Sequence, residues 1–323
     1  MNRFRFTLRL LALAVLALSA SSVARSQNLR SWISMTGDDF NSCTFTAPCR
    51  TFPITLSRTA TNGEVSLVGP GTYGAITITK SVTIDGGGYL AAINASGGTR
   101  AITINITNVA DTRKSVRLRG LSLNGADING TDGIQGIRIV AADKVYIEDT
   151  LIDNFDTSGG TNGRAISDER TNGGKLFVTN TIIRNSGANA VVVFPSAGST
   201  QITAVLDRVV IEGSTLSGVF AGPGSRVTVK DSNITGNGNA GVQADASAGT
   251  TEVMVERSVV SHNQIGIYSG PGSPVVRLSE TTVTDNVTGL QTAGSGTIDT
   301  FGNCRIAGNA AGNGPPTNNL GEQ

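Results

Sequence analysis

One short phrase of alternating apolar and polar residues recurs along this chain. Its clearest copies occupy residues 227–234, 253–260 and 276–283 and approximate Val-x-Val-x-x-Ser-x-Ile. Weaker copies occupy residues 116–123, 145–152, 176–183, 204–211 and 299–306, and successive copies begin 23 to 31 residues apart. Alternate side chains of a strand point to opposite faces, and a repeat of this length marks units that bury a core only by stacking. The pattern therefore predicts an all-β solenoid.

Aligning the copies predicts inward columns of core residues. The first column runs from Val116 to Val276, and its neighbour two residues later runs from Leu118 to Phe301. A third column of mostly small residues ends at Cys304, which predicts a buried and unreactive thiol there.

Each copy is followed by features of a further strand. Most copies lead into a turn that contains Asn, a residue suited to corners and to side-chain ladders. These residues are Asn154, Asn185, Asn237, Asn263, Asn286 and Asn309. Gly or Ala then opens another short apolar stretch, as at residues 136–139, 190–193, 241–244 and 266–268. Three strands per coil predict a parallel β-helix, which we place at residues 64–310.

Residues 27–63 differ from the repeat and are predicted to form an N-terminal cap. We expect a strand at 29–35 and a short helix at 53–60, because Pro53 suits a first helical turn and Gly63 follows its end. Cys43 and Cys49 are six residues apart and are predicted to form a disulfide. After the cap, strands are expected at 64–68, 75–79 and 81–85, followed by irregular coils up to Ala110. The Gly- and Asn-rich residues 311–323 are predicted to be a flexible tail.

Residues 1–26 combine Arg3, Arg5 and Arg9 with an apolar run, as a secretory signal peptide does. No second apolar run follows, so we expect no integral membrane segment and an exported protein, either periplasmic or extracellular. Removing the leader, which holds four Arg and no acidic residue, changes the formal net charge from +1 to −3. The remaining chain has no basic tract, which argues against a nucleic-acid partner. Oligomeric state stays open.

With three strands per coil, residues 64–310 resemble the right-handed parallel β-helix family, often called pectin-lyase-like. The segments Pro-Cys-Arg-Thr-Phe at 48–52 and Thr-Ile-Thr-Lys-Ser-Val-Thr-Ile at 77–84 are also similar to a group of exported bacterial β-helix proteins. The resemblance implies a polysaccharide groove along the outward face of the third strands. However, the Asn-Thr-Asp, Gly-His-Gly and Asp-Pro-His-Asp motifs of polygalacturonase-type and epimerase-type members are absent.

One candidate ligand-binding column is the outward position of the third strand. It holds Arg138, Ser167, Val192, Phe220, Gln243, Tyr268 and Gln291. Phe220 and Tyr268 would lie two coils, or roughly 9–10 Å, apart. Their rings would suit the stacking of two sugars, and Arg138, Gln243 and Gln291 would bind hydroxyls or carboxylates. The alternative is that they are scattered surface residues.

A second column offers candidate catalytic residues. Asp153 and Glu212 would lie two coils apart with Arg184 between them, near the wide end of the spacing in inverting glycoside hydrolases. An intervening Arg would keep both carboxylates ionised, so an ion-pair ladder is the alternative. Asp168 and Glu169, expected on the loop after a third strand, are the next carboxylates. The only His, His262, is expected at a solvated corner. No residue cluster has the spacing of a metal site, so we predict neither metal nor cofactor.

Three functions remain open on this sequence. The first is an exported protein that binds an extended polysaccharide without cleaving it, as the missing catalytic motifs favour. The second is a polysaccharide lyase or hydrolase with an unrecognised site, which leaves enzymatic activity uncertain. The third is a structural or adhesin-like surface protein, which the aromatic content of 5% favours.

Overall fold

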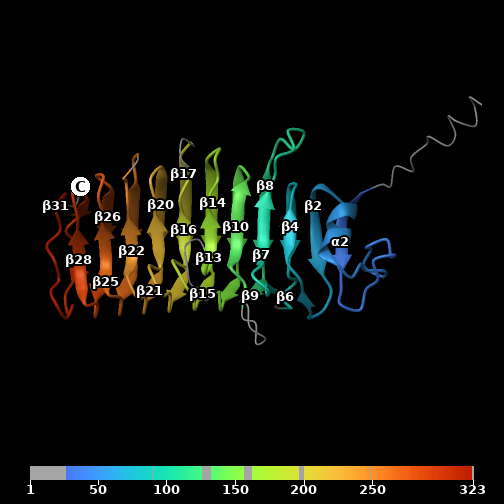
Figure 1. Cartoon of the computed structure of the whole chain (residues 1–323), viewed down its shortest axis with the longest axis horizontal. Coiled ribbons are helices and arrows are strands. Elements are labelled where there is room, and N and C mark those ends of the chain that lie inside the picture. The colour runs from blue at the N-terminus through green and yellow to red at the C-terminus, as the bar shows by residue number, and fades with distance from the viewer. Residues whose placement is uncertain are drawn as a thin grey trace, which may run out of the picture.

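The computed structural model describes residues 27–89, 91–125, 132–155, 162–195, 200–247 and 249–321. These residues form a right-handed parallel β-helix, in which the chain winds through three parallel sheets and each coil adds one strand to each sheet (Figure 1). The predicted fold class is therefore confirmed. The proposed signal peptide at 1–26 lies outside the described residues. In the part of the chain that is described, no helix is long and apolar enough to cross a membrane.

The three sheets are named by their order along one coil. The first sheet has 12 strands, in the order β1 (Asn28–Ile33), β2 (Thr59–Leu67), β5 (Val82–Asp85), β8 (Ser115–Arg119), β11 (Lys144–Glu148), β14 (Gly174–Thr179), β17 (Ile202–Asp207), β20 (Ser225–Lys230), β23 (Glu252–Glu256), β26 (Val275–Ser279), β29 (Thr297–Thr300) and β31 (Asn318–Asn319). The second has 10 strands, in the order β3 (Thr72–Tyr73), β6 (Ala91–Asn94), β9 (Leu121–Asn124), β12 (Leu151–Asp153), β15 (Ile182–Arg184), β18 (Val210–Glu212), β21 (Asn233–Thr235), β24 (Val259–Ser261), β27 (Thr282–Thr284) and β30 (Arg305–Ile306). The third has nine strands, in the order β4 (Ile76–Ile78), β7 (Arg100–Asn105), β10 (Gln135–Ala141), β13 (Arg164–Asp168), β16 (Val191–Val193), β19 (Val219–Ala221), β22 (Ala240–Ala244), β25 (Ile265–Ser269) and β28 (Thr288–Thr292).

The inward columns predicted from the alternation form the core. In the first sheet, Val227 pairs with Val253 and Val253 pairs with Val276, and all three are almost fully buried. A buried aliphatic side chain of this size contributes about 1.5–3 kcal/mol relative to an exposed one. Since the coils share one continuous apolar cluster, each coil is stabilised mainly by the coils before and after it.

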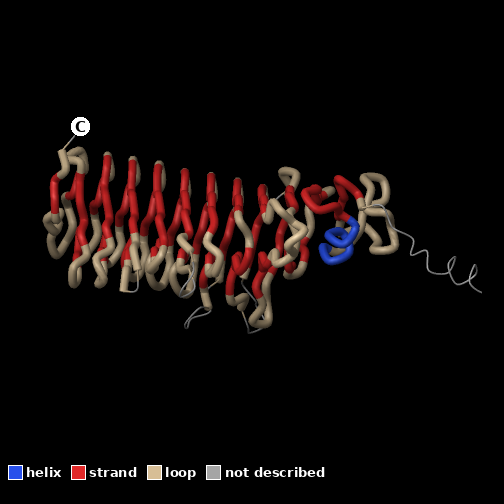
Figure 2. The backbone as a smooth tube through the Cα atoms, turned by 90° about the horizontal axis from the view of Figure 1, so that it is seen from above, coloured by secondary structure: helices blue, strands red, loops and turns tan. Residues whose placement is uncertain are grey.

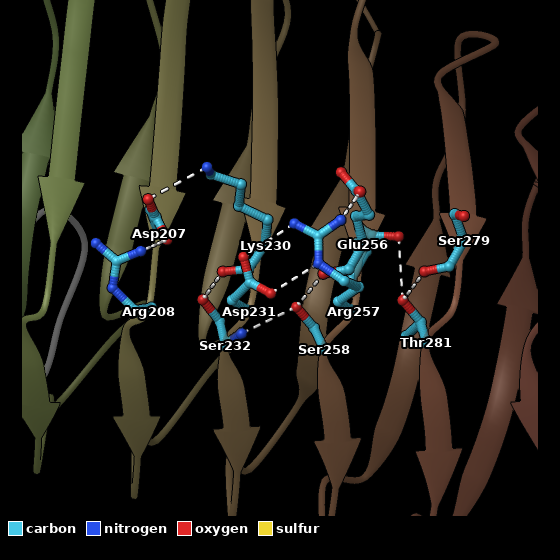
Figure 3. Close-up of polar contacts among 11 residues, drawn as sticks. Asp207, Arg208, Lys230, Asp231, Ser232, Glu256, Arg257, Ser258, Ser279 and Thr281 are labelled. Atoms are coloured by element: carbon cyan, nitrogen blue, oxygen red, sulfur yellow. Dashed lines mark hydrogen bonds and ion pairs between the residues drawn. The ribbon is translucent and has the colours of Figure 1, made fainter.

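The corner between the first and second sheets consists of residues with positive φ. Six of them are not glycine, namely Asp149, Asn180, Arg208, Asp231, Arg257 and Glu280. In Figure 3, two corner arginines and Lys230, which ends β20, pair with carboxylates of the same or the preceding coil: Arg208 and Lys230 contact Asp207, and Arg257 contacts Asp231. Ion pairs along the coil axis thus accompany a backbone conformation that non-glycine residues rarely adopt.

An asparagine ladder forms at the corner before the third sheet. The side-chain Nδ2 of Asn237 donates to Oδ1 of Asn263 at 2.8 Å, and Asn263 and Asn286 continue the series at 3.0 Å each to reach Asn309. Asn154 and Asn185 lie outside this buried series but form a separate pair, in which Asn185 Nδ2 donates to Asn154 Oδ1 at 3.1 Å. They adopt the positive φ one position earlier, and Phe155 and Ser186 take the ladder positions. A single residue of offset within the turn is invisible when turns are matched by composition alone.

The N-terminal end is closed by α2 (Phe52–Arg58), the blue helix in Figure 2. The helix ends two residues earlier than predicted because Thr59 already begins β2. Its Phe52 packs edge-on against Tyr73 at 5.2 Å between ring centroids and covers the open core. The Cys43–Cys49 disulfide is confirmed, with Cα atoms 4.7 Å apart. The irregular coils expected up to Ala110 are wrong, since β6 and β7 already occupy regular places in two sheets.

The last coil departs from the predicted register. Thr300, not Phe301, pairs with Leu278, and Ile298 pairs with Val276. The corner that follows is longer by one residue and includes Gly302 at a φ of 87°. Cys304 is free but only partly buried, contrary to expectation, because the second sheet ends with its coil. Within the predicted tail, Asn318–Asn319 forms β31 and pairs with β29.

Candidate functional site

The outward column of the third sheet forms one continuous row, here called the third-sheet row. Each member pairs with the next across neighbouring strands, in the order Arg138, Ser167, Val192, Phe220, Gln243, Tyr268 and Gln291. The predicted register is therefore confirmed. The predicted exposure is wrong at two positions, since Ser167 and Val192 are buried. Their burial divides the row into a charged part and an aromatic part.

The aromatic part of the row lies on β19, β22, β25 and β28. Phe220 and Tyr268 are half-buried and flank Gln243, as the predicted spacing of two coils requires. The side-chain oxygen of Gln243 accepts hydrogen bonds from Ser217 Oγ at 2.7 Å and Asn239 Nδ2 at 3.2 Å, which fixes the amide between the rings. These contacts hold a polar group between two aromatic groups on one face.

A third aromatic residue extends this part. Phe194 follows β16 and meets Phe220 edge-on, with 6.4 Å between ring centroids. It is 42% exposed. Phe194 lies one residue beyond the end of the strand, outside the aligned column, so the repeat pattern does not predict it.

At the charged end of the row, Arg138 and Ser167 join Arg164 in a cluster around Glu169, which lies beside the row. Arg138 Nε donates to Glu169 Oε2 at 3.0 Å, Arg164 Nη1 donates to Oε1 at 3.2 Å, and Ser167 Oγ donates to the same oxygen at 2.8 Å. Burial alone would raise the pKa of Glu169, but these hydrogen bonds and the two guanidinium charges lower it below its usual value. A carboxyl group with a lowered pKa stays ionised and is a poor proton donor at neutral pH.

Asp168 takes no part in this surface. It was expected on a loop, but it ends β13 and is fully buried. Arg170, also fully buried, donates from Nε to Asp168 Oδ1 at 2.8 Å and from Nη2 to Oδ2 at 2.5 Å. Burial raises the pKa of Asp168, against the effect of Arg170. The pair is sealed inside the coil and cannot meet a substrate.

The charged residues of the second candidate column form contacts with neighbouring protein side chains. Arg184 Nε lies 2.6 Å from Glu212 Oε1, and Asp153 accepts a hydrogen bond from Asn185 Nδ2 at 3.0 Å. Arg184 therefore pairs with one of the two carboxylates, as an ion-pair ladder would. His262 is exposed at a corner with a φ of 58°. Among the described residues, no group of three or more His, Cys, Asp or Glu could hold a metal ion.

Comparison with known proteins finds the same β-helix fold elsewhere. A family model described as "Right handed beta helix region" matches residues 40–311. A rhamnogalacturonan lyase is similar in structure with a TM-score of 0.55 and 16% identity, over 84% of this chain and 75% of that one. The pectate lyase Pel9A is similar with a TM-score of 0.52 and 16% identity, over 86% of this chain and 69% of that one. At this identity the likeness shows the fold alone. No curated protein matches the sequence.

Proposed function

Because the chain belongs to the right-handed β-helix family, we propose that it is an exported protein whose third-sheet row binds an extended polysaccharide without cleaving it. The observation that carries the proposal is the unbroken register of Phe220, Gln243, Tyr268 and Gln291 on one face. The two similar lyases are named for acting on polysaccharides, which supports this ligand class.

The dimensions of the row suit a linear glycan that lies along the coil axis. Six inter-strand steps separate Arg138 from Gln291, or roughly 29 Å at the usual strand spacing. Phe220 and Tyr268 would each stack on the apolar face of a sugar ring, and Gln243 would hydrogen-bond the hydroxyls between them. Arg138 and Arg164 would bind carboxylates or hydroxyls at the other end, where the cluster carries more positive than negative charge.

Binding without cleavage is favoured by the state of the carboxylates. A glycoside hydrolase needs one carboxyl group that stays protonated near neutral pH and reaches the glycosidic oxygen. Glu169 has a lowered pKa, Asp168 is sealed in the core, and Glu212 is paired with Arg184. None of the three is therefore an exposed carboxyl group free to act as the general acid.

Export is supported by two features. The leader predicted at residues 1–26 carries an apolar run after three arginines. The Cys43–Cys49 disulfide is of the kind that persists in oxidising compartments. The periplasm and the extracellular space are oxidising, and both would give an exported protein access to polysaccharides.

The test is a binding and turnover assay of the mature protein on soluble neutral and acidic polysaccharides. We expect retardation in affinity electrophoresis on at least one glycan, with no new reducing ends and no unsaturated product absorbing in the ultraviolet. The double variant Phe220→Ala/Tyr268→Ala should lose at least about tenfold in affinity, or about 1.4 kcal/mol.

The matched control is Phe40→Ala, which removes a ring that is 96% exposed in the N-terminal cap. Its affinity should equal that of the wild type. Release of product would replace this proposal with a lyase or hydrolase. Failure to bind any glycan would favour a structural or adhesin-like role instead.

A further inference from the structure

A recess on the first sheet lies away from the third-sheet row. Its volume is about 520 Å³, within the range of small-molecule sites. Thr83, Arg117 and Tyr146 line it from β5, β8 and β11 and are register partners in that order. The segment before β8, with Thr112 and Arg113, forms one wall, and it is part of the connection that projects beyond the coil near β8 in Figure 1.

The lining of the recess is cationic. It contains Arg113, Arg117 and Lys144 against a single carboxylate, Asp143. The charge of Arg117 is partly neutralised by Glu148, because Arg117 Nη1 donates to Glu148 Oε1 at 2.9 Å and to Oε2 at 3.0 Å. Arg113 and Lys144 are exposed and form no ion pair with any residue that the structure describes. Two cations therefore remain available to an anionic ligand.

An aromatic stack holds Arg117 in place. Its guanidinium carbon lies 4.8 Å from the ring centroid of Tyr146, and Tyr146 stacks on Phe177 with centroids 5.0 Å apart and planes 12° apart. The three side chains come from consecutive strands of the first sheet. Cation–π contact and ring stacking fix the guanidinium so that it loses little freedom when a ligand binds.

The wall of the recess is equally well fixed. The carboxylate of Asp111, which is buried, accepts hydrogen bonds from Ser81 Oγ at 2.6 Å and from the backbone N–H of Lys114 at 3.1 Å. The carbonyl of Lys114 in turn accepts from the backbone N–H of Asp143 at 2.8 Å. The segment with Arg113 is thus tied to the residues directly before β5 and β11, and the recess exists before any ligand enters.

We propose that this recess binds a carboxylated sugar, a hexuronate unit of an acidic glycan. Arg113 and Lys144 hold the carboxylate, with Arg117 beside them. The hydroxyl groups of Thr83, Thr112 and Ser115 and the amide of Asn62 also line the recess and bind the sugar hydroxyls. A recess of this volume, with many neutral polar groups beside the cations, suits a polyhydroxylated acid better than a bare inorganic anion. The inference does not depend on the third-sheet row.

The experiment is isothermal titration of the full mature chain with trigalacturonate, with a neutral galactose trisaccharide and with inorganic phosphate. We expect trigalacturonate to bind, and its affinity to fall about tenfold in Arg113→Ala and in Lys144→Ala and to weaken with salt. The neutral trisaccharide should bind at least about tenfold more weakly.

The matched control is Lys175→Ala. Lys175 is the exposed register partner of Lys144 on β14 and lies outside the recess. This variant should keep the wild-type affinity for trigalacturonate. A loss of trigalacturonate binding in Phe220→Ala/Tyr268→Ala but not in Arg113→Ala or Lys144→Ala would place the ligand on the third-sheet row instead, so failure of this inference can be told apart from failure of the proposed function.

Three results would overturn the inference. One is the absence of trigalacturonate binding in the wild type. Another is an affinity unchanged in both Arg113→Ala and Lys144→Ala. The third is phosphate binding as tight as trigalacturonate binding and lost in the same variants, since that would make the recess a general anion site.

Discussion

Replacing Arg170 with Met should be among the most damaging single substitutions in this coil. The guanidinium is fully buried and donates to both carboxylate oxygens of Asp168 and, at 2.9 Å, to the carbonyl of Ala142. Met has a comparable length and fills most of the space, so the main loss is electrostatic. Asp168 would be left as an unpaired carboxyl group in the core.

The size of the effect follows from that unpaired carboxyl group. Breaking a buried ion pair by removing one partner costs roughly 3–5 kcal/mol, against a total stability of roughly 5–15 kcal/mol for a typical domain. Replacing both partners with apolar residues is often neutral. We therefore expect Arg170→Met to lose roughly 3–5 kcal/mol and Asp168→Leu/Arg170→Met to recover most of it.

The pH dependence provides a second and independent readout. Burial already raises the pKa of Asp168, and the loss of Arg170 would raise it further. A carboxyl group whose pKa is higher in the folded state takes up a proton on folding, so its destabilising effect is greatest above the folded pKa. The deficit of Arg170→Met should therefore shrink as the pH is lowered from about 8 to about 5.

The assay is urea denaturation followed by circular dichroism at several pH values. The matched control is Arg184→Met, which breaks the exposed pair with Glu212 and should cost less than about 1 kcal/mol. If Arg170→Met is no more damaging than Arg184→Met, the buried ion pair does not have the proposed role. The same holds if Asp168→Leu/Arg170→Met is as unstable as Arg170→Met.

Three further predictions concern the corners and the recess. Asn263→Ala should cost about 1–3 kcal/mol in urea denaturation, because the amide of Asn237 and the backbone N–H of the same residue both lose their buried acceptor. Arg257→Glu should lower the thermal midpoint at low salt by placing a carboxylate beside Asp231, and the loss should largely vanish in about 1 M salt, where exposed charges are screened. Hydrogen bonds from Ser81 hold the pKa of Asp111 below its ordinary value of 3.8 despite burial, so its stabilising effect is present above that value and is lost as the pH falls through the folded pKa. Asp111→Asn should accordingly be less stable at pH 7 by thermal denaturation, and equal stability of the two proteins at pH 7 would contradict the role of Asp111.

The core could be predicted from the sequence because burial enforces a period of two. Val227, Val253 and Val276 must all point inward, and a slip of one residue would turn every side chain of a strand to the wrong face. The same constraint placed Phe220, Gln243 and Tyr268 in one outward row, since outward positions alternate with inward ones. Register along the middle coils was therefore available without a structure.

The corners and the ends escaped prediction because no such constraint acts there. Asn185 and Asn237 look equivalent in the sequence, yet only Asn237 is buried in the ladder. An extra corner residue near Gly302 moved Thr300 to the place expected for Phe301. Arg170 was assigned no role because charged side chains are almost never fully buried without a partner, and its partner Asp168 was expected on a loop.

The outward columns can be sorted into structural and binding positions by whether their charges and rings are already satisfied. At the corners of Figure 3, Arg257 and Asp231 neutralise each other across neighbouring coils, so such residues need no ligand to explain them. Arg113 and Lys144 differ, because the structure describes no ion pair for either although both line one recess. In a solenoid, where register makes ion pairs easy to form between neighbouring coils, cations left unpaired beside a preformed recess are the stronger sign of a binding site.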